Sequence, residues 1–108
     1  MAVAELNGAA IADEASFHRL SREAFGFPAS YADSIDALVD CMSYLRDDEN
    51  MTRFRLKPDE MLEIVITGAD QMKAQAPDLL EELAFCIGGI NERYEDYGEK
   101  PALALVLR

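Results

Sequence analysis

Hydrophobic residues recur at intervals of three or four in two stretches of the first half of the chain, and this spacing predicts two helices. The first is predicted to run from Asp13, a suitable N-cap, to about Phe25, with Gly26 in the position that ends a helix. The second is predicted to follow Ser34, another suitable N-cap. Its core-facing stripe consists of Ile35, Leu38, Met42 and Leu45.

Three short apolar segments predict strands at residues 3–6, 62–66 and 102–107. A long helix is predicted to begin at Pro77, because proline is tolerated at the first helical position, and to end near Tyr97. Within it, Gly88 and Gly89 indicate either a close contact with the sheet or a break. A short helical turn is expected over residues 70–76. Residues 46–60 are expected to form a polar loop with a short element around residues 52–56.

The order of these elements is β-α-α-β-α-β, which predicts an α/β fold. Helical crossovers between apolar strands are typical of parallel pairing. We therefore expect a small three-stranded parallel β-sheet packed with helices. The chain has 108 residues, of which half are hydrophobic, so a single domain spanning residues 1–108 can bury its own core.

The charge balance narrows the class of partner. The chain has 21 Asp and Glu against 10 Lys and Arg, a formal net charge of −11. Such a chain repels phosphate backbones and anionic lipid surfaces, so neither nucleic acid nor a membrane is an expected partner. A basic protein is favoured, because opposite charges speed encounter. The alternative interpretation is that the acidic composition serves only to keep the protein soluble.

Three features of the sequence indicate that the protein is located in the cytoplasm. Cys41 and Cys86 lie in apolar helical contexts and form no paired motif, as expected of buried free thiols in a reducing compartment. The N-terminus lacks the basic and apolar regions of a signal peptide. No apolar run approaches the roughly 20 residues that span a bilayer. We expect a cytoplasmic protein that is monomeric when free.

Residues that would support catalysis or metal binding are scarce. The one histidine, His18, has no second ligand at a suitable spacing, so we interpret it as a surface or packing residue. The chain contains no phosphate-binding loop, zinc-binding helix or nucleophile elbow. We therefore expect neither an enzyme nor a bound cofactor or metal.

An acidic row on the second helix is the main candidate site. Asp36 and Asp40 are four residues apart and share one face, and Tyr44 and Asp47 continue that row. Carboxylates on a rigid helix can each bind an arginine through two hydrogen bonds. Tyr44 could add apolar contact area. A solvated polar face accounts for the same spacing, so both interpretations stay open.

These residues resemble the central motif of the barstar-like ribonuclease inhibitors. The motif consists of Pro28, Tyr31, Asp36-Ala37-Leu38 and Asp40-Cys41. The similarity extends upstream through Leu6-Asn7-Gly8, Ile11 and His18, and the later strands and long helix follow in the family's order. The loop over residues 46–60 is longer than in the family's best-known member.

The resemblance implies a cytoplasmic inhibitor that covers the basic active site of a secreted, barnase-like ribonuclease with an acidic helix and its preceding loop. It implies that Asp36 and Asp40 are the inhibitory aspartates and that Glu92 is a further acidic contact. Ser34 stands where the family has an asparagine at the start of that helix. Tyr31 keeps an aromatic residue in the preceding loop. Two aromatic contacts of the family are replaced by Ser30 and Val39.

Two alternatives use the same residues. A barstar-like module could bind another basic or regulatory protein, because a fold does not determine a function. Asp33-Ser34-Ile35 is also similar to the motif of acyl carrier proteins, in which the serine carries phosphopantetheine. Carrier proteins are all-helical, so the predicted strands separate that alternative from the others.

Overall fold

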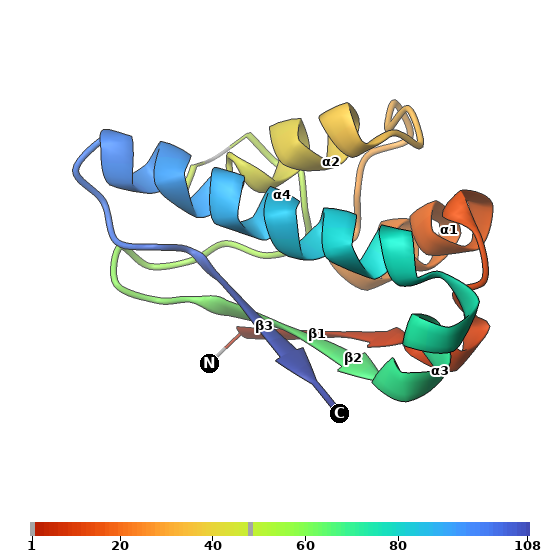
Figure 1. Ribbon diagram of the computed structural model, residues 1–108. Helices are drawn as coiled ribbons and strands as arrows, with labels where there is room; N and C mark the ends of the chain where they lie inside the picture. Colours follow the sequence, from red (N-terminus) through yellow and green to blue (C-terminus); the bar gives the residue numbers. More distant parts are fainter. Residues whose placement is uncertain (1, 48) are drawn as a thin grey trace.

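The computed structural model describes residues 2–47 and 49–108, and Figure 1 shows the arrangement of its elements. A short 3-10 helix (Gly8–Ala10) stands between β1 and α1. The remaining elements are β1 (Ala2–Asn7), α1 (Glu14–Phe25), α2 (Ile35–Met42), β2 (Leu62–Thr67), α3 (Ala69–Gln75), α4 (Pro77–Asp96) and β3 (Leu103–Leu107).

The three strands form one parallel sheet in the order β1-β2-β3, which confirms the predicted α/β fold. In β1, Ala4 and Leu6 are buried while Val3 and Glu5 are not, so one face of this edge strand points to the core. Figure 1 shows α1, α2 and α4 over one face of the sheet, while α3 lies at the end of β2. This sheet contradicts the all-helical fold that the carrier-protein alternative requires.

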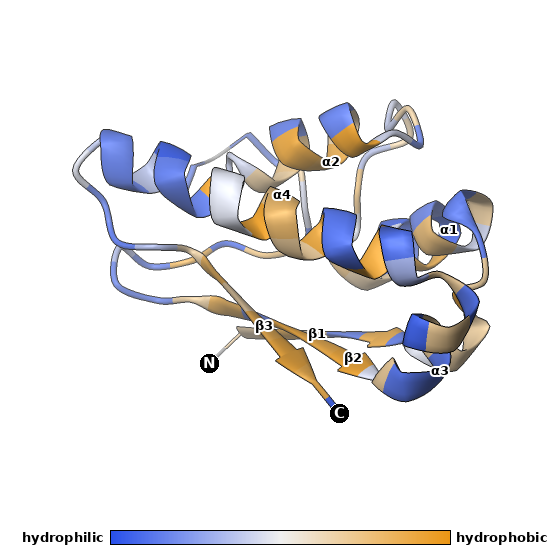
Figure 2. Ribbon diagram, viewed as in Figure 1, coloured by the Kyte–Doolittle hydropathy of each residue, from blue (hydrophilic) through white to orange (hydrophobic). Residues whose placement is uncertain are grey.

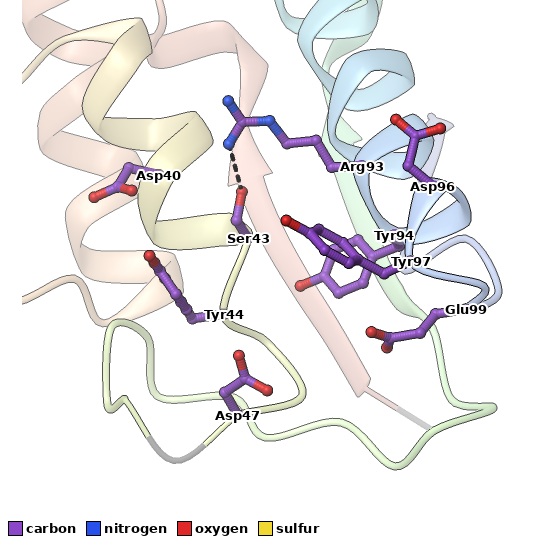
Figure 3. A pocket seen from close by; sticks show the side chains of 9 residues that line it. All are labelled: Asp40, Ser43, Tyr44, Asp47, Arg93, Tyr94, Asp96, Tyr97 and Glu99. Carbon is purple, nitrogen blue, oxygen red and sulfur yellow. Dashed lines mark hydrogen bonds between the residues drawn. The ribbon is translucent and has the colours of Figure 1, made fainter.

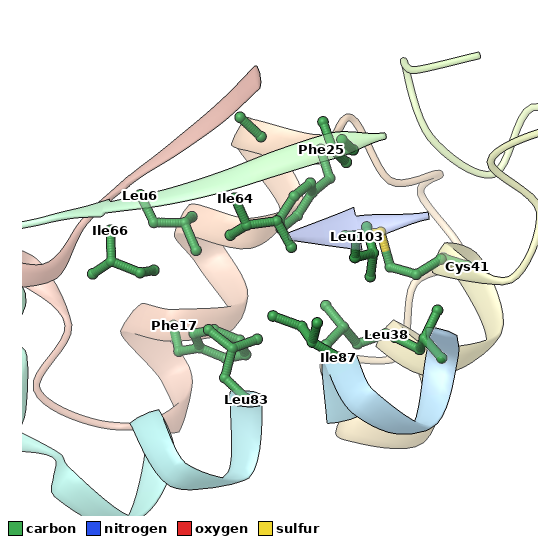
Figure 4. Close-up of a cluster of buried hydrophobic side chains, with 14 of the residues drawn as sticks. Leu6, Phe17, Phe25, Leu38, Cys41, Ile64, Ile66, Leu83, Ile87 and Leu103 are labelled. Carbon is green, nitrogen blue, oxygen red and sulfur yellow. The ribbon is translucent and has the colours of Figure 1, made fainter. Parts of the chain in front are cut away.

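The hydrophobic core lies between the sheet and the helices. Figure 4 shows Leu6, Ile64 and Ile66 of the strands facing Phe17 of α1 and Leu83 of α4. Figure 2 shows that β2 and β3 are mainly hydrophobic, whereas the C-terminal end of α4 is hydrophilic. One side of α4 therefore packs on the sheet, and most residues of its last turns are polar.

The predicted helix starts agree with the hydrogen bonds. The carboxylate of Asp13 accepts from Ser16 N at 2.9 Å, and the hydroxyl of Ser34 accepts from Ala37 N at 3.1 Å. Each side chain satisfies a backbone N–H that has no partner within its helix. Gly26 ends α1 with φ 66°, a left-handed conformation that glycine adopts without a steric penalty.

The second helix is shorter than its hydrophobic stripe predicts. It ends at Met42, so Leu45, Tyr44 and Asp47 lie in the turn that follows it. A continuing helix would use the N–H of Leu45 to bond the carbonyl of Cys41. In the structure that N–H donates to the Tyr94 hydroxyl of α4 at 3.0 Å. A tertiary contact therefore ends the helix.

The structure differs from two other expectations. Gly88 and Gly89 mark neither a close contact nor a break, since α4 continues through them and a Cβ added at either glycine would meet no packed neighbour within 4 Å. Residues 52–56 form no helix or strand; the loop is held by backbone bonds, including one from Leu56 N to Leu45 O at 2.8 Å. The short helical turn expected over residues 70–76 is present as α3 over residues 69–75, and α4 begins separately at Pro77 as predicted.

Candidate functional site

The second helix, α2, presents its carboxylates away from the core. Leu38, Cys41 and Met42 are buried, whereas Asp36 and Asp40 are not. Among the described residues, no hydrogen bond or ion pair engages the side chain of either aspartate. Asp36 and Asp40 of the predicted row are therefore accessible to a partner, and no ion pair among the described residues neutralises their charges.

Two buried tyrosine hydroxyls hold α2 at its ends. The Tyr94 hydroxyl donates to the carbonyl of Met42, the last residue of the helix, at 2.8 Å. The Tyr31 hydroxyl lies 3.5 Å from the carbonyl of Ser34, the N-cap, and 2.8 Å from Nδ1 of His18. Burial raises the pKa of both hydroxyls above the usual tyrosine value. Both therefore remain neutral donors at physiological pH.

The loop before α2 is also held in place. Asp33 adopts a left-handed conformation with φ 51°, and its carboxylate pairs with Arg22 of α1. The guanidinium of Arg22 also lies 5.8 Å from the centre of the Tyr31 ring. These contacts set the direction in which the chain enters α2, while Ser30 stays exposed on the loop.

A hollow of about 700 Å³ opens beside Asp40, between the turn after α2 and the C-terminal end of α4. We call it the acidic hollow. It is lined by Asp40, Ser43, Tyr44, Asp47, Arg93, Tyr94, Asp96, Tyr97 and Glu99. Figure 3 shows Tyr44 and Tyr97 on opposite sides of it. Four carboxylates and one guanidinium line it, so it favours a cationic group.

Two arginines give this region its shape. Arg93 of α4 donates to the hydroxyl of Ser43 at 3.2 Å, just past the C-terminal end of α2, where the helix dipole favours a cation. The side chain of Arg46 is almost fully buried and donates to the backbone carbonyls of Glu60 at 3.0 Å and Lys100 at 2.7 Å. Its guanidinium lies 5.1 Å from the centre of the Tyr94 ring. Arg46 thus ties the loop over residues 46–60 to the end of α4.

A second, more open hollow of about 440 Å³ lies on the other side of Arg93, between α2 and α4. We call it the apolar hollow. It is lined by Ile35, Asp36, Val39, Glu82, Phe85, Cys86, Gly89, Ile90 and Arg93. Burial raises the pKa of the Cys86 thiol, which keeps it neutral.

The predicted site residues separate into groups. Asp40, Tyr44 and Asp47 line the acidic hollow, although the last two lie beyond the helix. Asp36 and Val39 line the apolar hollow.

The other four predicted residues lie outside both hollows. Ser34 caps α2, and Ser30 lies exposed on the loop before it. Tyr31 is only 5% exposed and packs against Phe27 in the core, so it supports the loop rather than presenting a contact surface. Glu92 is exposed on α4 but lines neither hollow.

Sequence reasoning missed the contribution of α4. Glu82, Phe85, Gly89 and Arg93 recur at intervals of three or four, as residues on one helix face do. Two aromatic residues, Phe85 and Tyr97, fall outside the core-facing stripe of that helix. These two signals could have identified this face of α4 as a candidate surface. No local sequence pattern, however, predicts that this face lies beside α2.

The described residues offer little chemistry beyond binding. No group of three His, Cys, Asp or Glu side chains among them is placed to hold a metal ion. His18 is buried and contacts the Tyr31 hydroxyl, so it has a packing role. Within the same part of the chain, none of the helices has the length and apolar character needed to cross a membrane.

Comparison with known proteins identifies one family. The family model described as Barstar (barnase inhibitor) matches residues 1–106 of the chain. No individual curated protein matches the chain. The family match covers nearly the whole sheet, the acidic row of α2 and all of α4.

Proposed function

The chain belongs to the barstar family of barnase inhibitors, and on that premise we propose that it inhibits a basic ribonuclease of the barnase type. In this proposal, α2 and its preceding loop cover the ribonuclease active site. Asp36 and Asp40 occupy the positions where RNA phosphates would otherwise bind. Members of the family are inhibitors rather than enzymes, which fits the absence of catalytic motifs in this sequence.

One observation carries the proposal: accessible, unpaired carboxylates stand on a helix that is fixed at both ends. A ribonuclease must present cations to bind phosphate. Asp36 and Asp40 can accept bidentate hydrogen bonds from such cations without a conformational change, because Tyr31 and Tyr94 hold α2 in place. The acidic hollow extends the negative surface next to Asp40.

The cellular setting follows from the same proposal. We place the protein in the cytoplasm, where it would neutralise a ribonuclease before that enzyme is secreted. The formal charge of −11 would accelerate its encounter with a basic enzyme. Association should therefore slow as the salt concentration rises.

The direct test is titration of the purified protein into a barnase-type ribonuclease while RNA cleavage is followed. We expect stoichiometric inhibition by the wild type. Asp40→Ala should raise the Kd by about a hundredfold or more, because it leaves a cation of the enzyme buried without its partner. The measurement is the Kd from inhibition curves at a fixed salt concentration.

Asp70→Ala is the matched control. Asp70 is an exposed aspartate on α3, at the opposite end of the molecule from α2 (Figure 1), and its removal changes the net charge by the same amount. We expect this variant to inhibit almost as well as the wild type. Equal and small effects of the two substitutions would refute the placement of the site on α2.

A second candidate function is the binding of another basic or regulatory protein through the same surface. It is favoured by Ser30 and Val39, which replace two aromatic contacts of the family, so the apolar part of this surface differs from the surface that the family presents to its ribonuclease. Recovery of a different basic protein from native cells by the wild type, but not by Asp40→Ala, would support this candidate if the ribonuclease is not inhibited.

A further inference from the structure

Phe85 has no role in the core of this protein. It is 84% exposed and belongs to neither the buried core nor the residues packed against it. Its neighbours on α4, Leu83 and Ile87, are buried in that core. The phenyl ring therefore stands on the surface with almost all of its apolar area in water, where it contributes little to folding.

The ring of Phe85 lies beside apolar side chains of both α4 and α2. Phe85 lines the apolar hollow together with Ile35, Val39 and Ile90. Exposed apolar surface gathered around a concave region is typical of an interaction site. The combination of an exposed aromatic residue and a hollow beside it resembles the anchor regions at which truncation weakens binding most.

The charges around the hollow determine which partner fits. Asp36 and Glu82 line it, and the whole chain has a formal charge of −11. A second copy of this chain would bring carboxylates against carboxylates, which opposes self-association. A basic protein would meet the same carboxylates with cations while its apolar side chains covered Phe85.

The hollow is continuous with the surface that carries the proposed function. Asp36 belongs both to the acidic row of α2 and to the lining of the apolar hollow, and Arg93 lines both hollows. A protein seated on Asp36 and Asp40 would therefore also reach Phe85. We propose that Phe85 is an apolar anchor for the basic ribonuclease. This inference rests on the proposed function.

The test is the Kd of Phe85→Ala for a barnase-type ribonuclease. We expect the Kd to rise about tenfold, as for the truncation of a well-packed interface aromatic. The melting temperature should stay unchanged, because the ring is exposed in the free protein. Phe85→Leu should recover most of the affinity. Leu107→Ala, which truncates a 44% exposed residue of β3, is the control and should leave the Kd unchanged.

The salt dependence separates the anchor from the carboxylates. The Kd ratio of Phe85→Ala to wild type should stay constant between low and high salt, because apolar burial is not screened. The ratio for Asp40→Ala should fall as salt rises.

Three outcomes would overturn the inference. If Asp40→Ala loses inhibition while Phe85→Ala binds like the wild type, the proposed function stands and the anchor is refuted. If the wild type binds no barnase-type ribonuclease, both proposals fail. If the wild type forms a concentration-dependent dimer that Phe85→Ala abolishes, the ring serves self-association instead.

Discussion

The polar groups on the buried side of α2 have hydrogen-bond partners within the described part of the protein, whereas the carboxylates on its solvent-facing side do not. On the buried side, the Tyr94 hydroxyl donates to Met42 O and accepts from Leu45 N, so each group has a partner. On the other side, Asp36 and Asp40 have no side-chain partner among the described residues. The first arrangement stabilises the helix, whereas like charges four residues apart destabilise a helix by about 0.2–0.5 kcal/mol.

This difference separates the groups that position the site from the groups that bind. A helix of only eight residues has little stability of its own. The buried hydroxyls and the Ser34 cap hold α2, so its outer side can carry carboxylates that the fold does not require. Removal of a positioning group should therefore reduce stability, and removal of a binding carboxylate should not.

The largest effect on stability is expected for Tyr94→Phe. The substitution leaves Leu45 N and Met42 O without their buried partner, and each unsatisfied group costs about 1–3 kcal/mol. We expect the free energy of unfolding, measured by urea denaturation, to fall by about 2 kcal/mol. Tyr97→Phe is the control, because the Tyr97 side chain is exposed and its hydroxyl can bond to water. Equal changes in the two variants would contradict the positioning role of Tyr94.

A smaller effect, confined to alkaline pH, is expected from Tyr31. Burial, followed by the nearby charge of Asp33, raises its pKa in the folded state. The unfolded chain then loses its proton first, near the usual tyrosine pKa of about 10. Stability contributed by Tyr31 is thus complete below about pH 10 and is lost as the pH rises above it, by at most about 1.4 kcal/mol per pH unit.

Tyr31→Phe tests this prediction because phenylalanine does not titrate. At pH 7 the variant should be less stable than the wild type, since it lacks the hydroxyl that contacts His18. Above about pH 10 the two unfolding free energies should converge. Curves that stay parallel from about pH 7 to about pH 11 would show that Tyr31 does not determine the alkaline loss.

The smallest effect is expected for Asp40→Asn and has the opposite sign. Asparagine keeps the size and helix propensity of aspartate but removes the repulsion with Asp36 and a negative charge near the C-terminal end of α2. We expect the free energy of unfolding to rise by a few tenths of a kcal/mol, while affinity for the ribonuclease falls. A loss of stability larger than the gain expected here would mean that Asp40 also supports the fold.

Local sequence patterns were sufficient to predict the helix caps, the parallel sheet and the family. Asp13 and Ser34 cap their helices as expected, because a cap depends on side chains three residues apart. The apolar strands formed a parallel sheet because helices connect them. The motif around Asp36 and Asp40 identified the family, which the match over residues 1–106 confirms. The roles of the individual site residues remain predictions.

The sequence by itself therefore determined the elements, their order, the family and the acidic row, since each depends on neighbouring residues. Only the tertiary structure decided where α2 ends and which face of α4 lies beside it. Tyr94 contacts Leu45 and Met42 across 49 and 52 positions of the chain. Such contacts depend on how whole elements pack, which no local periodicity encodes. The same packing brings Phe85, Arg93 and Tyr97 beside the aspartates of α2.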